Sequence, residues 1–144
     1  MTRTAFTNEQ QHTMTNEMQI RNRVEAWIRS IQEHDIKGIL AWHHPHIAMY
    51  DVPPPFQSNG LDAYRKTWEE FLPALEKGAH AFQLMDLQIT AGEDVAIAYS
   101  PMKCVYQDKA TGRTELDFRL TIGFKKIDGE WWFIHEHHSI PADN

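Results

Sequence analysis

Asp51 is the residue whose surroundings best suit acid–base chemistry, because it ends a short apolar run and is followed by three prolines. Prolines cannot donate hydrogen bonds to a sheet, so residues 47–52 are expected to form a strand that stops there. Burial at the end of an apolar strand raises the pKa of a carboxylate, and a rigid loop fixes its direction, as a general base requires. The alternative is that Asp51 caps a turn through its own backbone.

Polar and apolar residues alternate along a second expected strand, residues 114–126. Successive side chains of a strand point to opposite faces, so Asp117, Arg119 and Thr121 share one face. The other face carries only apolar residues: Leu116, Phe118, Leu120, Ile122 and Phe124. Either the polar set lines a binding cavity and the apolar set packs against a second subunit, or the polar set faces water and the apolar set forms the core.

The last expected strand, residues 131–139, is polar at its end on both faces. Strict alternation places Trp131, Phe133, His135, His137 and Ser139 on one face, opposite Trp132, Ile134, Glu136 and His138. A uniformly packed sheet would be apolar along its whole inner face. The pattern therefore predicts a cavity that opens at one end of the sheet.

Nine histidines include two dense clusters, His43-His44-x-His46 and His135-x-His137-His138. His135 and His137 would point the same way on a strand, within reach of one metal ion. The first cluster is expected in a solvated turn. A histidine metal site is therefore the least favoured hypothesis, and we expect no metal and no cofactor, since no glycine-rich phosphate loop is present either.

The composition excludes several classes of partner. The 144 residues carry a net charge of −6 without a Lys/Arg cluster, which argues against nucleic acids and anionic membranes. No apolar run approaches the ~20 residues of a membrane span, and the first 19 residues lack the apolar region of a signal peptide. The single cysteine, Cys104, is interpreted as a reduced strand residue, and the cytoplasm is the expected compartment.

The elements that must position these residues follow from periodicity. Residues 1–14 are interpreted as a disordered leader and residues 15–144 as one domain. Helices are expected from residue 20 to about 33, from a cap at Asp35 to a turn at residues 43–46, and from Leu61 to Pro73. Four antiparallel strands, roughly 80–90, 94–107, 114–126 and 131–139, follow. This order predicts an α+β fold with helices on one face of a curved antiparallel sheet.

Three stretches carry a resemblance to a known family. They are His34-Asp35-Ile36-Lys37-Gly38-Ile39, the strand end Met49-Tyr50-Asp51 followed by proline and Gly60, and the stretch from Asp128-Gly129-Glu130-Trp131 to Ser139-Ile140-Pro141. Over about residues 20–140 the chain resembles the nuclear-transport-factor-like superfamily, in its SnoaL-like and ketosteroid-isomerase-like branch. The resemblance implies a cystatin-like, cone-shaped α+β barrel with a deep pocket, usually a homodimer through its sheet.

In ketosteroid isomerase an aspartate base moves a proton on an enolisable ketone, while a tyrosine and a protonated aspartate stabilise the enolate oxygen. The resemblance implies that Asp51 is the base. The tyrosine position falls on Trp27, which donates one hydrogen bond, and the aspartate position falls at or beside Thr121. Because both depart from the family pattern, Arg119 beside His135 and His137 is expected to hold a carboxylate or a developing enolate.

The expected function is therefore a pocket protein for a small, enolisable or partly apolar substrate, of the isomerase, cyclase, lyase or hydratase type. Asp51 would be the base, and Arg119, His137 and Trp27 the electrophilic or orienting groups. The expected ligand-binding residues are Tyr50, Phe56, Tyr64, Trp68, Asp117, Thr121 and His135. The alternative is a non-catalytic small-molecule-binding or dimeric interaction module that uses the same aromatic pocket.

Overall fold

A computed structural model describes residues 14–142, and the leader predicted for residues 1–14 lies outside this range apart from Met14. Helix α2 (Asn16–Gln32) begins after Thr15, whose side chain accepts a hydrogen bond from the Met18 amide. The predicted apolar stripe of α2 is buried. Helix α3 (Ile36–Leu40) begins after Asp35, which accepts a hydrogen bond from the Gly38 amide at 3.2 Å, as the sequence predicts.

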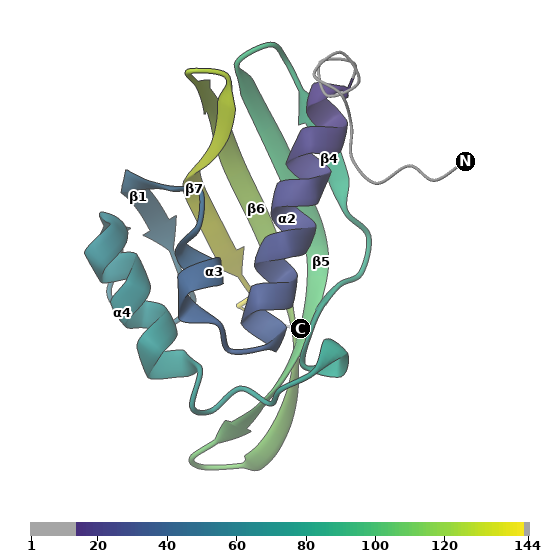
Figure 1. Ribbon diagram of the computed structural model, residues 1–144. Coiled ribbons are helices and arrows are strands. Elements are labelled where there is room, and N and C mark those ends of the chain that lie inside the picture. The colour runs from purple at the N-terminus through teal and green to yellow at the C-terminus, as the bar shows by residue number, and fades with distance from the viewer. Residues whose placement is uncertain (1–13, 143–144) are drawn as a thin grey trace.

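Seven strands form one curved sheet, and α2 lies across one of its faces (Figure 1). The strands are β1 (His43–Tyr50), β2 (Ser58–Asn59), β3 (Phe82–Leu84), β4 (Gln88–Ala91), β5 (Val95–Asp108), β6 (Gly112–Ile127) and β7 (Glu130–Ser139). Their order is β2-β1-β7-β6-β5-β3, and β4 also pairs with β5. The C-terminal strands are antiparallel as predicted, whereas β1 runs parallel to β7, so the sheet is mixed.

The segment between α3 and the third helix differs from the prediction. Residues 43–46, expected to be a turn, are the first half of β1. The pairing of β1 with β7 is interrupted between His43 and Ala48, which accommodates Pro45 because proline has no amide hydrogen to donate. Ser58 and Asn59 form a short strand before Gly60, whose φ of 90° leads into helix α4 (Leu61–Phe71).

One further segment differs from the prediction. The single strand predicted at residues 80–90 is a 3₁₀ turn, η1 (Ala79–Ala81), followed by two short strands, β3 and β4. Both short strands pair with β5, at different places along its length. Because β5 is 14 residues long, it pairs with both β3 and β4 along the same edge.

The core lies between the helices and the inner face of the sheet. The apolar residues of β6 point inward: Phe118, Leu120, Ile122 and Phe124 are buried and Leu116 is half-buried. Asp117 and Arg119 are exposed on the outer face, and Thr121 is half-buried there. Of the two interpretations that the sequence left open for this strand, the structure has the one in which the apolar set is the core.

A β-bulge in β7 changes which of its residues point inward. Gly123 pairs with His135 and the next residue, Phe124, pairs with Phe133, so Ile134 has no partner of its own in β6. An extra residue in one strand shifts the alternation of faces beyond it. Trp131 and Phe133 are buried before the bulge, and Glu136 and His138 after it. The strict alternation expected for residues 131–139 is therefore wrong from Ile134 onward.

The architecture agrees with the predicted α+β class. Within residues 14–142, helices α2, α3 and α4 pack on one face of a curved sheet, and their large buried side chains meet those of the sheet. Trp27 of α2 and Trp68 of α4 contact edge to face, with ring centroids 6.1 Å apart. The helices and the sheet thus share one apolar core, and one end of this core is hollow.

Candidate functional site

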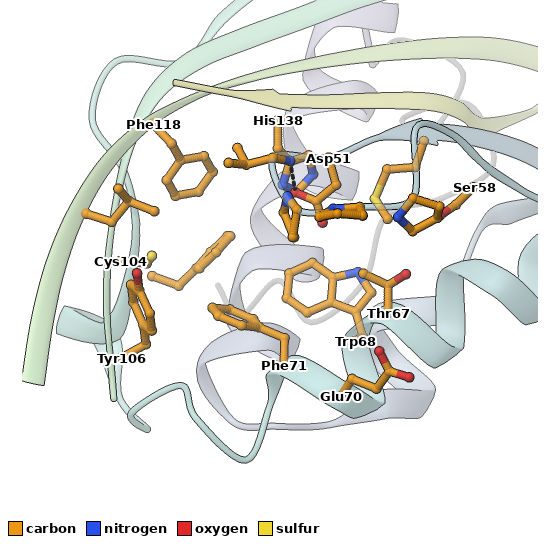
Figure 2. Close-up of a pocket in the computed structure, with 17 residues that line it drawn as sticks. Asp51, Ser58, Thr67, Trp68, Glu70, Phe71, Cys104, Tyr106, Phe118 and His138 are labelled. Carbon is orange, nitrogen blue, oxygen red and sulfur yellow. Dashed lines mark hydrogen bonds between the residues drawn. The ribbon is translucent and has the colours of Figure 1, made fainter. Parts of the chain in front are cut away.

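A cavity of about 500 Å³ lies between α4, the end of β1 and the inner face of the sheet (Figure 2). Its walls are mainly aromatic, with Trp68, Phe71, Phe82 and Phe118 among the residues that line it. Asp51 and His138 supply polar groups, and Glu70 lies at the margin; none of the lining residues is Lys or Arg. This volume and lining are typical of a site for a small, mostly apolar molecule.

Asp51 and His138 come from neighbouring parallel strands. Tyr50 pairs with His137, so the next residue of each chain segment, Asp51 and His138, lies on the inner face side by side (Figure 2). The Oδ1 atom of Asp51 accepts a hydrogen bond from the Val52 amide at 2.8 Å. The turn-capping role that the sequence left open is therefore present, and it fixes the direction of the carboxylate at the cavity wall.

Behind His138 lies a fully enclosed carboxylate. Glu136 is 0% exposed, and its Oε2 atom is 2.6 Å from the Nε2 atom of His43. The hydroxyl of Tyr64 donates to the same carboxylate, at 2.9 Å from Oε2. The indole nitrogen of Trp27 in turn donates to that hydroxyl at 3.0 Å. The Oε1 atom of Glu136 is 3.4 Å from the Nε2 atom of His138.

His43 has a hydrogen-bond acceptor beside each of its ring nitrogens. Its Nδ1 atom is 3.0 Å from the carbonyl oxygen of Ala41, and its Nε2 atom faces Glu136. Both neighbours are acceptors when Glu136 is ionised, so a protonated ring donates from both nitrogens. His43 was expected in a solvated turn; it is 2% exposed because it begins a buried strand instead.

Burial and neighbouring charges act in opposite directions on this cluster. Burial by itself would raise the pKa of Glu136, but the charge of His43 and the hydrogen bonds from His138 and His43 lower it to about 2. Burial opposes the charge of His138, yet Glu136, and to a lesser extent Asp51, raise the pKa of its imidazole above the ordinary value. Burial and the charge of Glu136 raise the pKa of the Tyr64 hydroxyl, which stays protonated.

Two of the predicted site residues lie behind the cavity rather than in it. Trp27 and Tyr64 are buried at 2% and 0% exposure, and neither lines the cavity. Both belong to the hydrogen-bonded cluster around Glu136. Trp68, by contrast, borders the cavity, and its indole nitrogen is buried without a hydrogen-bond partner in the described part of the chain.

Five predicted site residues lie on the outer face of the sheet, away from the cavity. They are Arg119, Asp117, Thr121, His135 and His137. Arg119 donates to the Ser139 hydroxyl at 3.1 Å, and His135 contacts the carbonyl oxygen of Ala48 at 2.8 Å. Strand alternation explains the placement of the β6 residues, and the bulge at Ile134 explains that of the two histidines. The structure therefore does not bring Arg119 to Asp51.

Tyr50 and Phe56 lie near the proline loop. Tyr50 is 40% exposed and packs against His135 and His137, with ring centroids 4.7 and 5.4 Å away. Phe56 is 99% exposed and borders a shallow hollow of about 700 Å³ on the other side of the loop, which Tyr50 also lines. Neither residue lines the deeper cavity.

The histidines of the two clusters are divided between the faces of the sheet. His43 and His138 lie inside, whereas His135 and His137 lie outside, with ring centroids 6.4 Å apart. Within residues 14–142 no group of three or more His, Cys, Asp or Glu side chains is arranged to hold a metal ion. Cys104 lines the cavity as a thiol, because burial raises its pKa to about 12.

Sequence reasoning missed Glu136, His43 and the part that His138 plays. The pattern in β7 indicated such a site: near the end of the strand the residues of both faces are polar, His135 and His137 on one face and Glu136 and His138 on the other. One of these two polar pairs therefore had to point inward. The bulge decides which pair, and Gly123, which pairs with His135 next to the bulge, was the available clue, since glycine in a strand often marks a bulge.

A curved sheet packed on helices, with acid–base groups on the wall of an apolar cavity, defines a pocket protein with an NTF2-like, cystatin-like fold. The family model of the SnoaL-like domain matches residues 20–143, and the chain belongs to this family.

Solved structures support the assignment. An NTF2-like protein of unknown function from Pseudomonas putida KT2440 is 31% identical, with 88% of this chain and 87% of that chain covered and a TM-score of 0.77. A ketosteroid isomerase-like protein from Erwinia carotovora atroseptica SCRI1043 is 17% identical, with 89% and 100% covered and a TM-score of 0.71. The association domain of C. elegans CaMKII is 13% identical, with 84% and 92% covered and a TM-score of 0.65.

The last two similarities establish the fold alone. No curated protein is significantly similar to the chain. No helix within residues 14–142 combines the length and the apolar character that crossing a membrane requires.

Proposed function

We propose that the cavity binds a small, uncharged and mostly apolar ketone and that Asp51 moves a proton on it, with His138 as the group that stabilises the negative charge. The observation that carries the proposal is the placement of Asp51 and His138 side by side in the wall of an otherwise apolar cavity. A carboxylate next to an imidazole in such a place is a natural acid–base pair.

The charges of the lining favour an uncharged substrate. Asp51 lies beside the imidazole of His138, Glu70 lies at the margin of the cavity, and none of the lining residues is Lys or Arg. A carboxylate ligand would meet repulsion that His138 alone does not offset. A ketone avoids this repulsion and becomes negative only as the reaction proceeds.

In the proposed reaction the carboxylate of Asp51 takes a proton from the carbon next to the carbonyl group. The electron pair of the broken C–H bond moves onto the carbonyl oxygen, and the N–H group of His138 donates a hydrogen bond to the enolate. Asp51 then returns the proton to the same carbon or to another. Return to another carbon is an isomerisation, with no oxidant, reductant or further reactant needed.

The family resemblance supports the role of Asp51 and alters that of its partner. Asp51 occupies the position of the base in ketosteroid isomerase, whereas the two oxyanion positions correspond to Trp27 and to a residue at or beside Thr121. Trp27 donates to Tyr64 and Thr121 lies on the outer face of the sheet. His138 therefore takes the oxyanion role in our proposal, in place of Arg119 or His137.

The test is NMR-detected exchange of deuterium from solvent into a panel of enolisable ketones, with wild type and Asp51→Asn compared. General-base catalysis contributes about 10²–10⁴-fold, so Asp51→Asn should slow the exchange by that factor. Asp117→Asn is the matched control, because Asp117 is an exposed aspartate on the outer face, and it should exchange at the wild-type rate. Equal rates for wild type and Asp51→Asn would refute the proposal.

The second candidate is a binding module without catalysis, and the mainly aromatic lining of the cavity favours it equally. A ketone that raises the melting temperature of wild type and Asp51→Asn alike, with no exchange in either protein, would favour this candidate.

We also propose that a second copy of the chain covers the outer face of the sheet. Val95, Ile97 and Tyr99 of β5 are 57%, 43% and 47% exposed on this face, and Tyr50 of β1, beyond β6 and β7, is 40% exposed. Exposed apolar side chains in such a row are typical of an interface. Sedimentation should give a dimer for wild type and a monomer for Ile97→Glu; a wild-type monomer at all concentrations would contradict this proposal.

A further inference from the structure

We propose that Glu136 is a positioning residue for His138: it holds the imidazole through Nε2 and leaves Nδ1 to donate a hydrogen bond into the cavity. This inference rests on the proposed function, because it explains how His138 would become the donor. Glu136 itself does not touch the cavity.

The geometry of β7 brings the two side chains together. Glu136 and His138 are two residues apart on a strand, so both point to the inner face. The Oε1 atom of Glu136 is 3.4 Å from the Nε2 atom of His138. The Nδ1 atom of His138 has no hydrogen-bond partner within residues 14–142, and the ring borders the cavity (Figure 2).

Aromatic contacts fix the plane of the imidazole. The ring of Phe118 stacks on it with an interplanar angle of 16° and a centroid distance of 5.9 Å. Trp68 packs against it at 62°, with centroids 6.5 Å apart. The imidazole therefore lies between β6 and α4, and its nitrogen atoms keep their directions.

The carboxylate of Glu136 is itself held in place. His43 and Tyr64 lie 2.6 and 2.9 Å from Oε2, and both are fully buried. Tyr64 is also 3.1 Å from Oε1 and receives a hydrogen bond from Trp27. Because His43 occupies Oε2, the Oε1 atom remains for His138. This arrangement makes Glu136 a fixed reference for the orientation of His138.

The charged and titratable groups around His138 come from three elements. Asp51 follows β1 and faces the ring directly, Glu136 lies on β7, and His43 of β1 and Tyr64 of α4 lie behind Glu136. Phe118 is the contact from β6. Two carboxylates next to the ring favour its cationic form, in which both nitrogens carry protons and Nδ1 is able to donate. The raised pKa of His138 agrees with this arrangement.

The test is an NMR titration of the histidine side chains in the full chain labelled with ¹⁵N. In wild type the neutral ring of His138 should carry its proton on Nε2. Glu136→Gln should lower the titration midpoint of His138 by about one pH unit or more, since an adjacent opposite charge typically shifts a pKa by 1–3. Glu130→Gln, which removes an exposed carboxylate from the same strand, should leave the midpoint within about 0.2 pH unit.

An unchanged midpoint in Glu136→Gln would overturn the inference. If Glu136→Gln does not fold, the tautomer of His138 in the wild-type spectrum is the test. A neutral ring protonated on Nε2 would support the proposed orientation, and one protonated on Nδ1 would contradict it. The titration requires no substrate. If the titration midpoint of His138 depends on Glu136 but no ketone exchanges deuterium, only the proposed reaction is refuted. If exchange requires Asp51 but the midpoint of His138 does not depend on Glu136, only the positioning role is refuted.

Discussion

The two faces of β7 carry nearly the same residue types in opposite environments. His137 is exposed on the outer face beside Tyr50, whereas His138 lies in the cavity wall between Phe118 and Trp68. His135 contacts a backbone carbonyl on the outside, whereas Glu136 is enclosed by His43 and Tyr64. The site therefore depends on the face of β7 on which a side chain lies, and not on the type of side chain alone. The extra residue, Ile134, determines which residues beyond it point inward.

The two faces also differ in the free-energy cost of a substitution. Side chains on the outer face exchange contacts with water at little cost, so single changes there usually alter stability by no more than about 0.5 kcal/mol. On the inner face a removed partner leaves a buried charge or donor without compensation, which is far more costly. The following predictions use this difference.

The largest effect is expected from insertion of one alanine between His135 and Glu136, which shifts the end of β7 by one residue relative to β6. A one-residue shift exchanges the faces of the residues beyond it, so Glu136 and His138 would point outward and His137 inward. We expect loss of the cooperative thermal transition measured by circular dichroism. Ile134→Ala keeps the register and should still unfold cooperatively. An insertion variant that retains the near-ultraviolet spectrum of wild type would show that the register of β7 does not hold the inner face.

Glu136→Gln comes second. It removes the carboxylate that faces the buried His43 imidazole, and breaking a buried pair in this way costs about 3–5 kcal/mol. Urea unfolding at neutral pH measures the loss. His137→Gln, the control on the outer face, should cost no more than about 0.5 kcal/mol. Equal stability of the two variants would show that the buried pair does not hold the inner face.

Acid should reduce the difference between wild type and Glu136→Gln. The folded pKa of Glu136, about 2, lies below its ordinary value of 4.5, so the stability that its charge contributes is complete above pH 4.5. This contribution is lost as the pH falls from 4.5 toward 2. Urea unfolding at several pH values should show the two free energies of unfolding converging in that range. A constant difference down to pH 2 would contradict the lowered pKa.

A smaller effect is expected for Tyr64→Phe. The change removes a hydrogen bond to the Glu136 carboxylate, worth about 1.5–3 kcal/mol, and leaves the Trp27 indole without its acceptor. Urea unfolding at neutral pH measures this loss. A Tyr64→Phe protein as stable as wild type would show that this hydrogen bond does not help to hold the Glu136 carboxylate.

The sequence predicted the elements well because helix and strand periodicity depend on local spacing. The buried stripe of α2 and the cap at Asp35 are confirmed, as is the α+β class. Residues 43–46 were assigned to a turn because Pro45 suggested a break, whereas an interruption in the pairing with β7 accommodates the proline. Such an interruption depends on a strand far away in the sequence.

The site was harder to predict for the same reason. Asp51 at the cavity wall follows from a local pattern, the end of an apolar strand before prolines. The identity of the residue that partners Asp51 does not follow from a local pattern. His137 and His138 are adjacent in the sequence, and only the bulge at Ile134 determines which of them faces inward. Arg119 was favoured for its charge, and the pairing of β6 with β5 and β7 places it outside.

The central claim, that the inner histidine and not the outer one serves the reaction, is tested most directly by deuterium exchange into enolisable ketones with His138→Gln and His137→Gln. Loss of an oxyanion donor typically slows a reaction by about 10²–10³-fold, so His138→Gln should lose the exchange to that extent, while His137→Gln should match wild type. A variant at His137 that is slowed as much as one at His138, or a His138→Gln protein as fast as wild type, would contradict the account.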